Sequence, residues 1–244
     1  MRVWDVDPGY LSRQRLLGEH REIHGLYVVL AENRSGYRHH PETLRWVGAL
    51  PALARRHAHL RAEMHLRGYN HQSPMPGATH DAIWPTTFID PPHEQWPILR
   101  QKYVEGESGR IPLPRNAQQL WAQHKYSVMA RSPALYQTLG PTLAKTGRAG
   151  PDAELCKQLV DTLRSPAPWP RTRNALAHMW GIVSQHVSPE EVATMHAALT
   201  TAPRRVLART AALAKAHQVT YLLHSTALAE LMVYLPSEAS RPLA

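Results

Sequence analysis

Two groups near the start of the chain have the types needed for amine chemistry: the α-amine of Met1 and the carboxylate of Glu22. An α-amine has a pKa near ~8, against ~10.4 for lysine, so about a tenth of it is a neutral nucleophile at neutral pH. Arg2 follows Met1, and initiator methionine is generally removed only before small residues, so we expect Met1 to remain. Its amine would form a Schiff base without burial, and Glu22 would act as the partner acid or base.

A helix must position Glu22. Asp7-Pro8 has the types of an N-cap and a first helical residue, which predicts a helix from there to about Glu32. The residues expected to face the core from it recur at helical spacing: Leu16, Ile23, Tyr27 and Leu30.

Glu22 also has a purely structural interpretation. Arg15, Glu19 and Glu22 share one stripe of the predicted helix, which gives Glu22 an arginine and a second carboxylate as neighbours. An exposed ion-pair stripe is the usual role of such charges. Because arginine lowers the pKa of a glutamate and a second carboxylate raises it, the sequence leaves the protonation state of Glu22 open.

The first twenty-six residues, MRVWDVDPGYLSRQRLLGEHREIHGL, resemble without a gap the start of the pyrimidine-dimer DNA glycosylases of the phage endonuclease V family. The resemblance implies that the Met1 amine and Glu22 are catalytic. It also implies a set of DNA-binding residues: Arg2, Gln14, Arg15 and Arg21. This chain departs from the family where Arg15 replaces a histidine, Gly25 an arginine and His20 an aromatic residue.

Two further segments carry the resemblance over roughly the first seventy residues. GYRHHPETL (Gly36–Leu44), which contains Arg38 as a further DNA-binding candidate, looks like a bacterial variant of the family, and HLRAEMHLRGYN (His59–Asn70) is similar to its helix ending in Arg-Gly-aromatic. The family implies a glycosylase with abasic-site lyase activity that acts on double-stranded DNA carrying pyrimidine dimers or related damage and needs no cofactor.

A basic amphipathic helix is predicted from Leu50 to Arg67, ended by Gly68 in the manner of a C-cap. The apolar residues expected on one side are Leu53, Leu60 and Met64, and the basic residues expected on the other are Arg55, Arg56, Arg61 and Arg67. A positive face of this kind is usually only solvated, but beside a lesion site it would follow a DNA backbone.

The segment from about Ser73 to Arg115 is rich in proline, which leaves little room for long helices. We expect a connector that packs on the core, because aromatic residues at this density normally dock. Those aromatic residues are Trp84, Phe88 and Trp96. Insertion of these rings into DNA as wedges is the alternative.

Helices dominate again from Ala117. They are expected near residues 117–131, 133–146, 152–164, 171–187, 189–200 and 203–233. Two stretches, His124–Gly140 and Thr172–Glu191, resemble the YbgA-like domain, a helical module of unassigned chemistry in bacterial proteins. The chain is therefore expected to be all-α, with an endonuclease V-like domain (1–75), a Pro-rich connector (76–116) and a C-terminal helical bundle (117–244).

Composition limits the partners. The 244 residues carry a formal charge of +9, with a sequence pI near 10.0, which favours a polyanion such as DNA. Cys156 is the only cysteine, and no stretch approaches the ~20 apolar residues of a membrane span. We expect a cytoplasmic, nucleoid-associated protein with no membrane partner.

No metal site is expected from the sequence. The sixteen histidines are scattered, and His39-His40 lacks the i, i+4 helical spacing with a nearby carboxylate. We also find no glycine-rich phosphate loop, serine hydrolase elbow or paired acidic motif of metal-dependent nucleases. DNA cleavage by this chain would therefore use amine chemistry.

Two other functions stay open. The first is a DNA-binding module that kept the fold and lost the chemistry, with the C-terminal half recruiting a protein partner. The second is an enzyme on a small nucleobase-like ligand, with a pocket near His124, Tyr126 and His178. In this half Lys125 and Arg131 are also candidates for DNA contact, although packing or surface charge is the simpler role for each.

Overall fold

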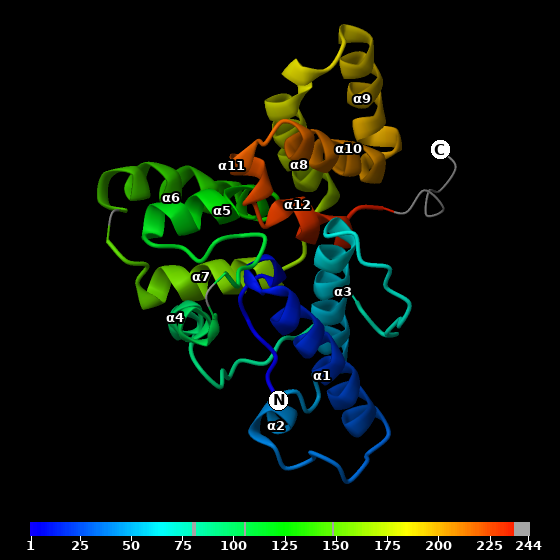
Figure 1. Ribbon diagram of the computed structural model, residues 1–244, viewed down its shortest axis with the longest axis vertical. Coiled ribbons are helices and arrows are strands. Elements are labelled where there is room, and N and C mark those ends of the chain that lie inside the picture. Colours follow the sequence, from blue (N-terminus) through cyan, green and yellow to red (C-terminus); the bar gives the residue numbers. More distant parts are fainter. Residues whose placement is uncertain (80–81, 105, 148, 237–244) are drawn as a thin grey trace. The chain divides into compact units, whose positions relative to one another are not determined.

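The computed structural model describes residues 1–79, 82–104, 106–147 and 149–236 (Figure 1). These residues form α-helices and short 3-10 helices and no strand, which confirms the predicted all-α class. Within them, no helix is both long and apolar enough to cross a membrane. Contacts divide the chain into unit 1, which is Met1–Pro114 with Pro151–Arg164, and unit 2, which is Arg115–Gly150 with Ser165–Ala244. The domain limits expected from the sequence stay a prediction.

Unit 1 contains η1 (Pro8–Tyr10), α1 (Arg13–Ala31), α2 (Pro41–Arg45), α3 (Leu50–Leu66), α4 (Pro92–Lys102) and α7 (Ala153–Arg164). Helices α1 and α3 pack against each other, as do α4 and α7 (Figure 1). Leu16 and Ile23 of α1 are fully buried as expected, whereas Tyr27 and Leu30 are half-buried.

The prediction of one helix from Asp7-Pro8 to Glu32 is wrong at its start. The Asp7 carboxylate accepts from the backbone N of Gly9 at 2.7 Å, but this cap begins only the 3-10 turn η1. The backbone is extended at Leu11, and Ser12 caps α1 by accepting from the backbone N of Arg15 at 3.3 Å. The interruption buries Tyr10 and Leu11 completely.

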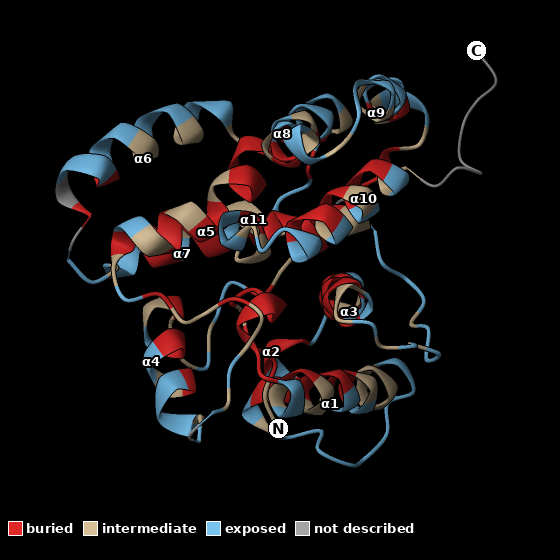
Figure 2. Cartoon of the chain, turned by 45° about the horizontal axis from the view of Figure 1, so that its top comes forward, coloured by how far each residue is buried: buried red, intermediate tan, exposed pale blue. Residues whose placement is uncertain are grey.

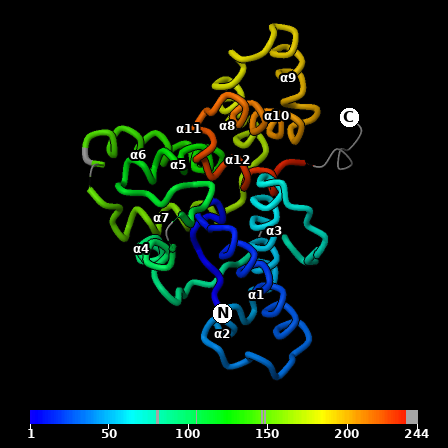
Figure 3. The backbone as a smooth tube through the Cα atoms, in the orientation of Figure 1, coloured from blue at the N-terminus to red at the C-terminus, as the bar shows by residue number. Residues whose placement is uncertain are grey.

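Helix α3 has almost the predicted bounds, and Gly68 follows it in the left-handed region with φ of 84°. Its surface differs from the prediction. Figure 2 shows that most of α3 is buried, and Arg55 and Arg56 are only 3% and 4% exposed. After α3 the backbone turns back alongside this helix (Figure 3).

The proline-rich connector contains a helix that the sequence did not predict. Proline at N1 is compatible with a helix start, and α4 begins at Pro92 and continues through Pro97. Trp96 is buried, the indole N of Trp84 donates to the backbone O of Arg164 at 3.0 Å, and the guanidinium of Arg164 lies 4.9 Å from the Phe88 ring centre. These rings therefore dock on unit 1 as expected and are not free as wedges.

Unit 2 contains α5 (Ala117–Met129), α6 (Pro133–Thr146), α8 (Trp169–Val183), η2 (Ser184–His186), α9 (Pro189–Thr201), α10 (Pro203–Ala216), α11 (Thr220–Leu223), α12 (Ala227–Glu230) and η3 (Leu231–Val233). The single helix expected over residues 203–233 is wrong, because Gln218 adopts φ of 54° and ends the run after α10. Ser188 caps α9 as predicted, accepting from the backbone N of Glu191.

Candidate active site

The chain start lies against α1. Val3, Trp4 and Val6 are 2%, 5% and 1% exposed, so the first residues are held in the core of unit 1 by apolar side chains. This places the amine of Met1 3.7 Å from Oε1 of Glu22, and the backbone N of Arg2 donates to Oε2. The Glu22 side chain is 37% exposed. An amine and a carboxylate that are twenty-one positions apart thus share one partly open site.

The second carboxylate of the predicted stripe points elsewhere. Glu19 is buried and binds Arg56 of α3 through two bonds, Nε to Oε1 at 2.7 Å and Nη2 to Oε2 at 3.0 Å. Its Oε1 also accepts from the backbone N of Trp4 at 3.2 Å, and Nη1 of Arg56 donates to the backbone O of Val6 at 2.8 Å. Burial raises the pKa of Glu19, and Arg56 opposes that shift. The pair fastens the chain start to α1 and α3.

Asp5 forms a second anchor. Its carboxylate pairs with the guanidinium groups of Arg45 and Arg164, and its backbone N donates to Oε1 of Gln95 at 2.9 Å. Arg45 also pairs with the buried carboxylate of Glu42 at 3.0 Å. These contacts bring α2, α4 and α7 to the first residues of the chain. The sequence did not predict these two anchors, because the arginines that pair with Glu19 and Asp5 lie 37 to 159 positions from them.

The predicted DNA-binding residues fall into two groups. Arg2 pairs with Asp90 and lies over the Trp4 ring, and Arg15 donates to the backbone O of Lys102 at 3.0 Å. Both side chains are therefore engaged within unit 1. The side chains of the other group are exposed. Gln14 and Arg21 lie on α1, and Arg38 lies on the link between α1 and α2.

Gln14 and Arg21 lie on one face of α1 together with two glycines. The residues of this glycine face are Gln14, Gly18, Arg21 and Gly25, spaced by four, three and four positions. A Cβ added at Gly18 or Gly25 would meet no atom within 4 Å, so packing does not require either glycine. Both are unfavourable inside a helix by about 0.5–1 kcal/mol relative to alanine. Glu22 adjoins this face.

The prediction of a positive, exposed face on α3 is wrong. Arg55 donates to the backbone O of Thr79, Arg56 pairs with Glu19, and Arg67 pairs with Glu63 at 2.7 Å. Of the four arginines, Arg61 keeps an exposed side chain. The helix predicted from the periodicity is confirmed, but three of its four arginines hold unit 1 together.

The candidates in unit 2 serve packing. Arg131 is buried and forms a two-bond pair with Glu230 at 3.0 and 2.8 Å. Nδ1 of His124 lies 2.8 Å from the backbone O of Leu120, and burial lowers the pKa of His124 to about 4. Burial also lowers the pKa of Lys125, whose Nζ lies 4.5 Å from the Tyr221 ring centre.

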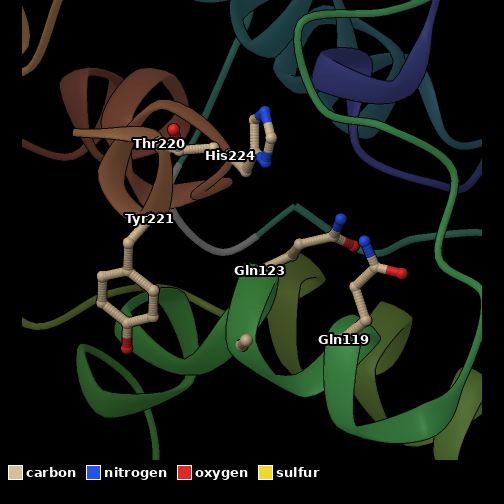
Figure 4. Close-up of a pocket in the computed structure, with 6 residues that line it drawn as sticks. Gln119, Gln123, Thr220, Tyr221 and His224 are labelled. Carbon is tan, nitrogen blue, oxygen red and sulfur yellow. The ribbon is translucent and has the colours of Figure 1, made fainter. Parts of the chain in front are cut away.

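A small pocket of about 110 Å³ lies in unit 2. Its lining residues, most of them labelled in Figure 4, come from α5 and from residues 220–224: Gln119, Ala122, Gln123, Thr220, Tyr221 and His224. The three residues around which a ligand pocket was expected are not among them: His124, Tyr126 and His178. His178 is exposed. The lining has amide, hydroxyl and imidazole groups but no charged anchor for a nucleotide phosphate.

Comparison with known families finds one match in each half of the sequence. Residues 1–76 match the family described as pyrimidine dimer DNA glycosylase, and residues 125–230 match the family described as protein of unknown function DUF1722. No curated protein and no solved structure matches the chain. Both sequence resemblances are thereby confirmed: residues 1–76 are similar to the pyrimidine dimer DNA glycosylase family and residues 125–230 to the DUF1722 family.

Proposed function

We propose that this protein is a DNA glycosylase with abasic-site lyase activity, acting on damaged duplex DNA through an imine formed by the Met1 amine. The observation that carries the proposal is the 3.7 Å separation between the Met1 amine and Oε1 of Glu22 at a partly exposed position. At this distance a small movement brings the two groups into hydrogen-bond reach, as general acid–base chemistry requires.

The chemistry assigns one role to each group. The Met1 amine attacks C1′ of the damaged nucleotide, the N–C1′ bond forms, and the base leaves with the electrons of the glycosidic bond and gains a proton. Glu22 accepts the proton released by the attacking amine and stabilises the positive charge that develops on the sugar. Ring opening at O4′ gives the imine. Loss of a C2′ proton then expels the 3′ phosphate, and water releases the amine.

The glycine face of α1 supplies a surface for the DNA backbone beside Glu22. The absence of side chains at Gly18 and Gly25 lets a phosphate backbone approach the helix closely, and Arg21 offers a guanidinium for that phosphate. Gln14 and Arg38 are exposed on the same unit and add polar and positive groups. The formal charge of +9 strengthens binding to a polyanion at low salt.

Reaching C1′ requires that the duplex be bent or the nucleotide extruded. Damage lowers this cost because a lesion weakens base stacking. A pyrimidine dimer is the lesion favoured by the family match, so the first substrate to test is a duplex with one thymine dimer. A duplex with an abasic site separates lyase chemistry from base removal, since it carries no base to be displaced.

The test is borohydride trapping on both duplexes and on undamaged DNA. Protein whose free Met1 amine is verified by intact mass should give a covalent adduct that maps to Met1. A Gly-Ser extension before Met1 should abolish the adduct, because it places an amide at the attacking position. Glu22→Gln should reduce it strongly, while the matched control Glu32→Gln, an exposed glutamate at the C-cap of the same helix, should not.

The outcomes separate the candidate functions. An adduct on both damaged duplexes supports a glycosylase with lyase activity, and an adduct on the abasic duplex alone supports a lyase without base removal. No adduct, with salt-dependent DNA binding intact, overturns the proposal and favours a binding module that lost the chemistry. In that case a protein partner of residues 117–244 becomes the next target.

A further inference from the structure

Four histidines from distant parts of unit 1 converge on one point. His20 and His24 lie one turn apart on α1, His57 lies on α3, and His71 lies in the segment that turns back after α3 (Figure 3). One ring nitrogen of each lies within 4.8 Å of those of the other three. Nε2 of His20 is 2.8 Å from Nε2 of His71 and 3.1 Å from Nε2 of His57.

Hydrogen bonding does not satisfy these nitrogens. A neutral imidazole nitrogen carries either one hydrogen or one lone pair, so Nε2 of His20 donates to one neighbour or offers a single lone pair to both. Nε2 of His24 is buried and has no hydrogen-bond partner. A cation at the centre would instead receive one lone pair from each ring. Nε2 of His20 would then not have to serve two neighbours, and Nε2 of His24 would gain a partner.

Burial disfavours the charged form of these rings, and the neutral form is the one that binds metal. Burial lowers the pKa of His20 to about 4 and that of His57 to about 3, and the neighbouring histidines add to both shifts. Burial also lowers the pKa of His24 and of His71. Arg21 and Arg61 act in the same direction on rings of the cluster.

We propose that His20, His24, His57 and His71 bind one zinc ion in a tetrahedral structural site. Zinc prefers nitrogen and sulfur ligands, and four nitrogens at about 2.0–2.1 Å from it lie about 3.3 Å apart. Two of the separations, 2.8 and 3.1 Å, are close to that value. Four protein ligands leave no open position for substrate, so the site is structural.

The remaining contact of His24 fits a ligand. A metal-bound histidine usually donates its other ring N–H to a backbone carbonyl, which fixes the orientation of the ring. His24 makes a hydrogen bond with the backbone of Ser73, while its Nε2 is buried without a hydrogen-bond partner. A cation at the centre would supply the partner that Nε2 lacks.

The zinc site and the Met1–Glu22 site lie on different faces of α1. His20 and His24 are each two positions from Glu22, which rotates them away from its side of the helix. The ion would therefore take no part in the amine chemistry. It would join α1, α3 and the segment around His71, and so hold the helix that carries Glu22.

The test is metal binding by the whole protein, prepared without a histidine tag. Wild-type protein should bind one equivalent of zinc per chain, measured by elemental analysis after dialysis, and cobalt should replace it with the intense visible absorption of a tetrahedral site. His57→Gln and His71→Gln should weaken binding by more than about tenfold, since loss of outer-shell partners alone costs about 10–100-fold. His65→Gln, at an exposed position of α3, is the matched control.

These readouts need no DNA, so they stand apart from the trapping experiment. Wild-type protein that binds no zinc overturns the proposal, as does equal binding by the His71→Gln and His65→Gln proteins. A weak cobalt spectrum typical of six-coordinate cobalt also overturns it. If His57→Gln does not fold, His71→Gln decides, because His71 is half-buried and lies outside the helices.

Discussion

The buried pair of Glu19 and Arg56 offers a sharp test of how the chain start is held. We expect Glu19→Gln to destabilise unit 1 by about 3–5 kcal/mol, the cost of leaving one member of a buried pair uncompensated. The Glu19 and Arg56 side chains are 1% and 4% exposed, so the smaller cost of about 0–1 kcal/mol for a surface pair does not apply. Glutamine keeps one acceptor but turns an NH2 group toward the guanidinium.

Unit 2 supplies the matched control. Arg131 and Glu230 also form a two-bond pair, here through Nη1 and Nη2, with side chains that are 1% and 3% exposed, so Glu230→Gln should cost a similar amount. Only Glu19→Gln also removes an anchor of residues 4–6. Glu19 accepts from the backbone N of Trp4, and its partner Arg56 donates to the backbone O of Val6. Imine trapping should therefore fall in Glu19→Gln and stay unchanged in Glu230→Gln.

Urea unfolding gives the free energies, and trapping is measured in buffer where both variants are folded. The reasoning is refuted if Glu19→Gln costs less than about 1 kcal/mol, the range of a surface pair. It is equally refuted if both variants lose trapping to the same extent, because general destabilisation would then explain the loss.

Four further results are expected. Gly18→Ala and Gly25→Ala should each stabilise α1 by about 0.5–1 kcal/mol in thermal or urea unfolding and weaken DNA binding in a salt titration; unchanged affinity would contradict the close approach of DNA. The pKa of His124 is lowered by burial to about 4, below its unfolded value near 6.5, so its contribution to stability is complete above pH ~6.5 and is lost as pH falls toward 4. Between pH 7 and 4 the loss of unfolding free energy measured in urea should be about 3 kcal/mol smaller in His124→Asn, which keeps a donor near the backbone O of Leu120, than in the wild-type protein. Gly109→Ala should destabilise by about 1–3 kcal/mol or more in urea unfolding, because its Cβ would lie 2.3 Å from the backbone O of Tyr10; a neutral substitution would contradict that packing. Zinc at 100 times its Kd should raise Tm by about 5–10 °C and a chelator should reverse the shift, an effect absent in His71→Gln.

The fold was predictable where local signals decide it. Ser188-Pro189 and Gly68 mark helix ends by chemistry confined to one turn, and both were placed correctly. Asp7-Pro8 carried an equally good local signal, yet burial of Tyr10 and Leu11 interrupts the helix there. Gln218 takes a left-handed conformation without being glycine or asparagine, so no sequence signal marked the end of α10.

The site was predictable only as far as the resemblance reached. The resemblance predicted that the Met1 amine and Glu22 act together, and the structure places these two groups side by side. The arginines of α3 were predicted on the surface because helical periodicity says nothing about a carboxylate on another helix, such as Glu19 for Arg56. The i, i+4 spacing of His20 and His24 was visible in the sequence, but the other two histidines of the cluster lie in separate segments, at positions 57 and 71.

The discontinuity of unit 1 has a consequence for synthesis. Its last helix, α7, ends at Arg164, whose side chain pairs with Asp5 and whose backbone O receives the indole of Trp84. On the ribosome the first 114 residues therefore emerge without α7, and α5 and α6 of the other unit are made before it appears. A nascent chain must hold its N-terminal part incomplete across that interval. A fragment cut at residue 76 permanently lacks α7 and also α4, so expression trials should extend to at least residue 164.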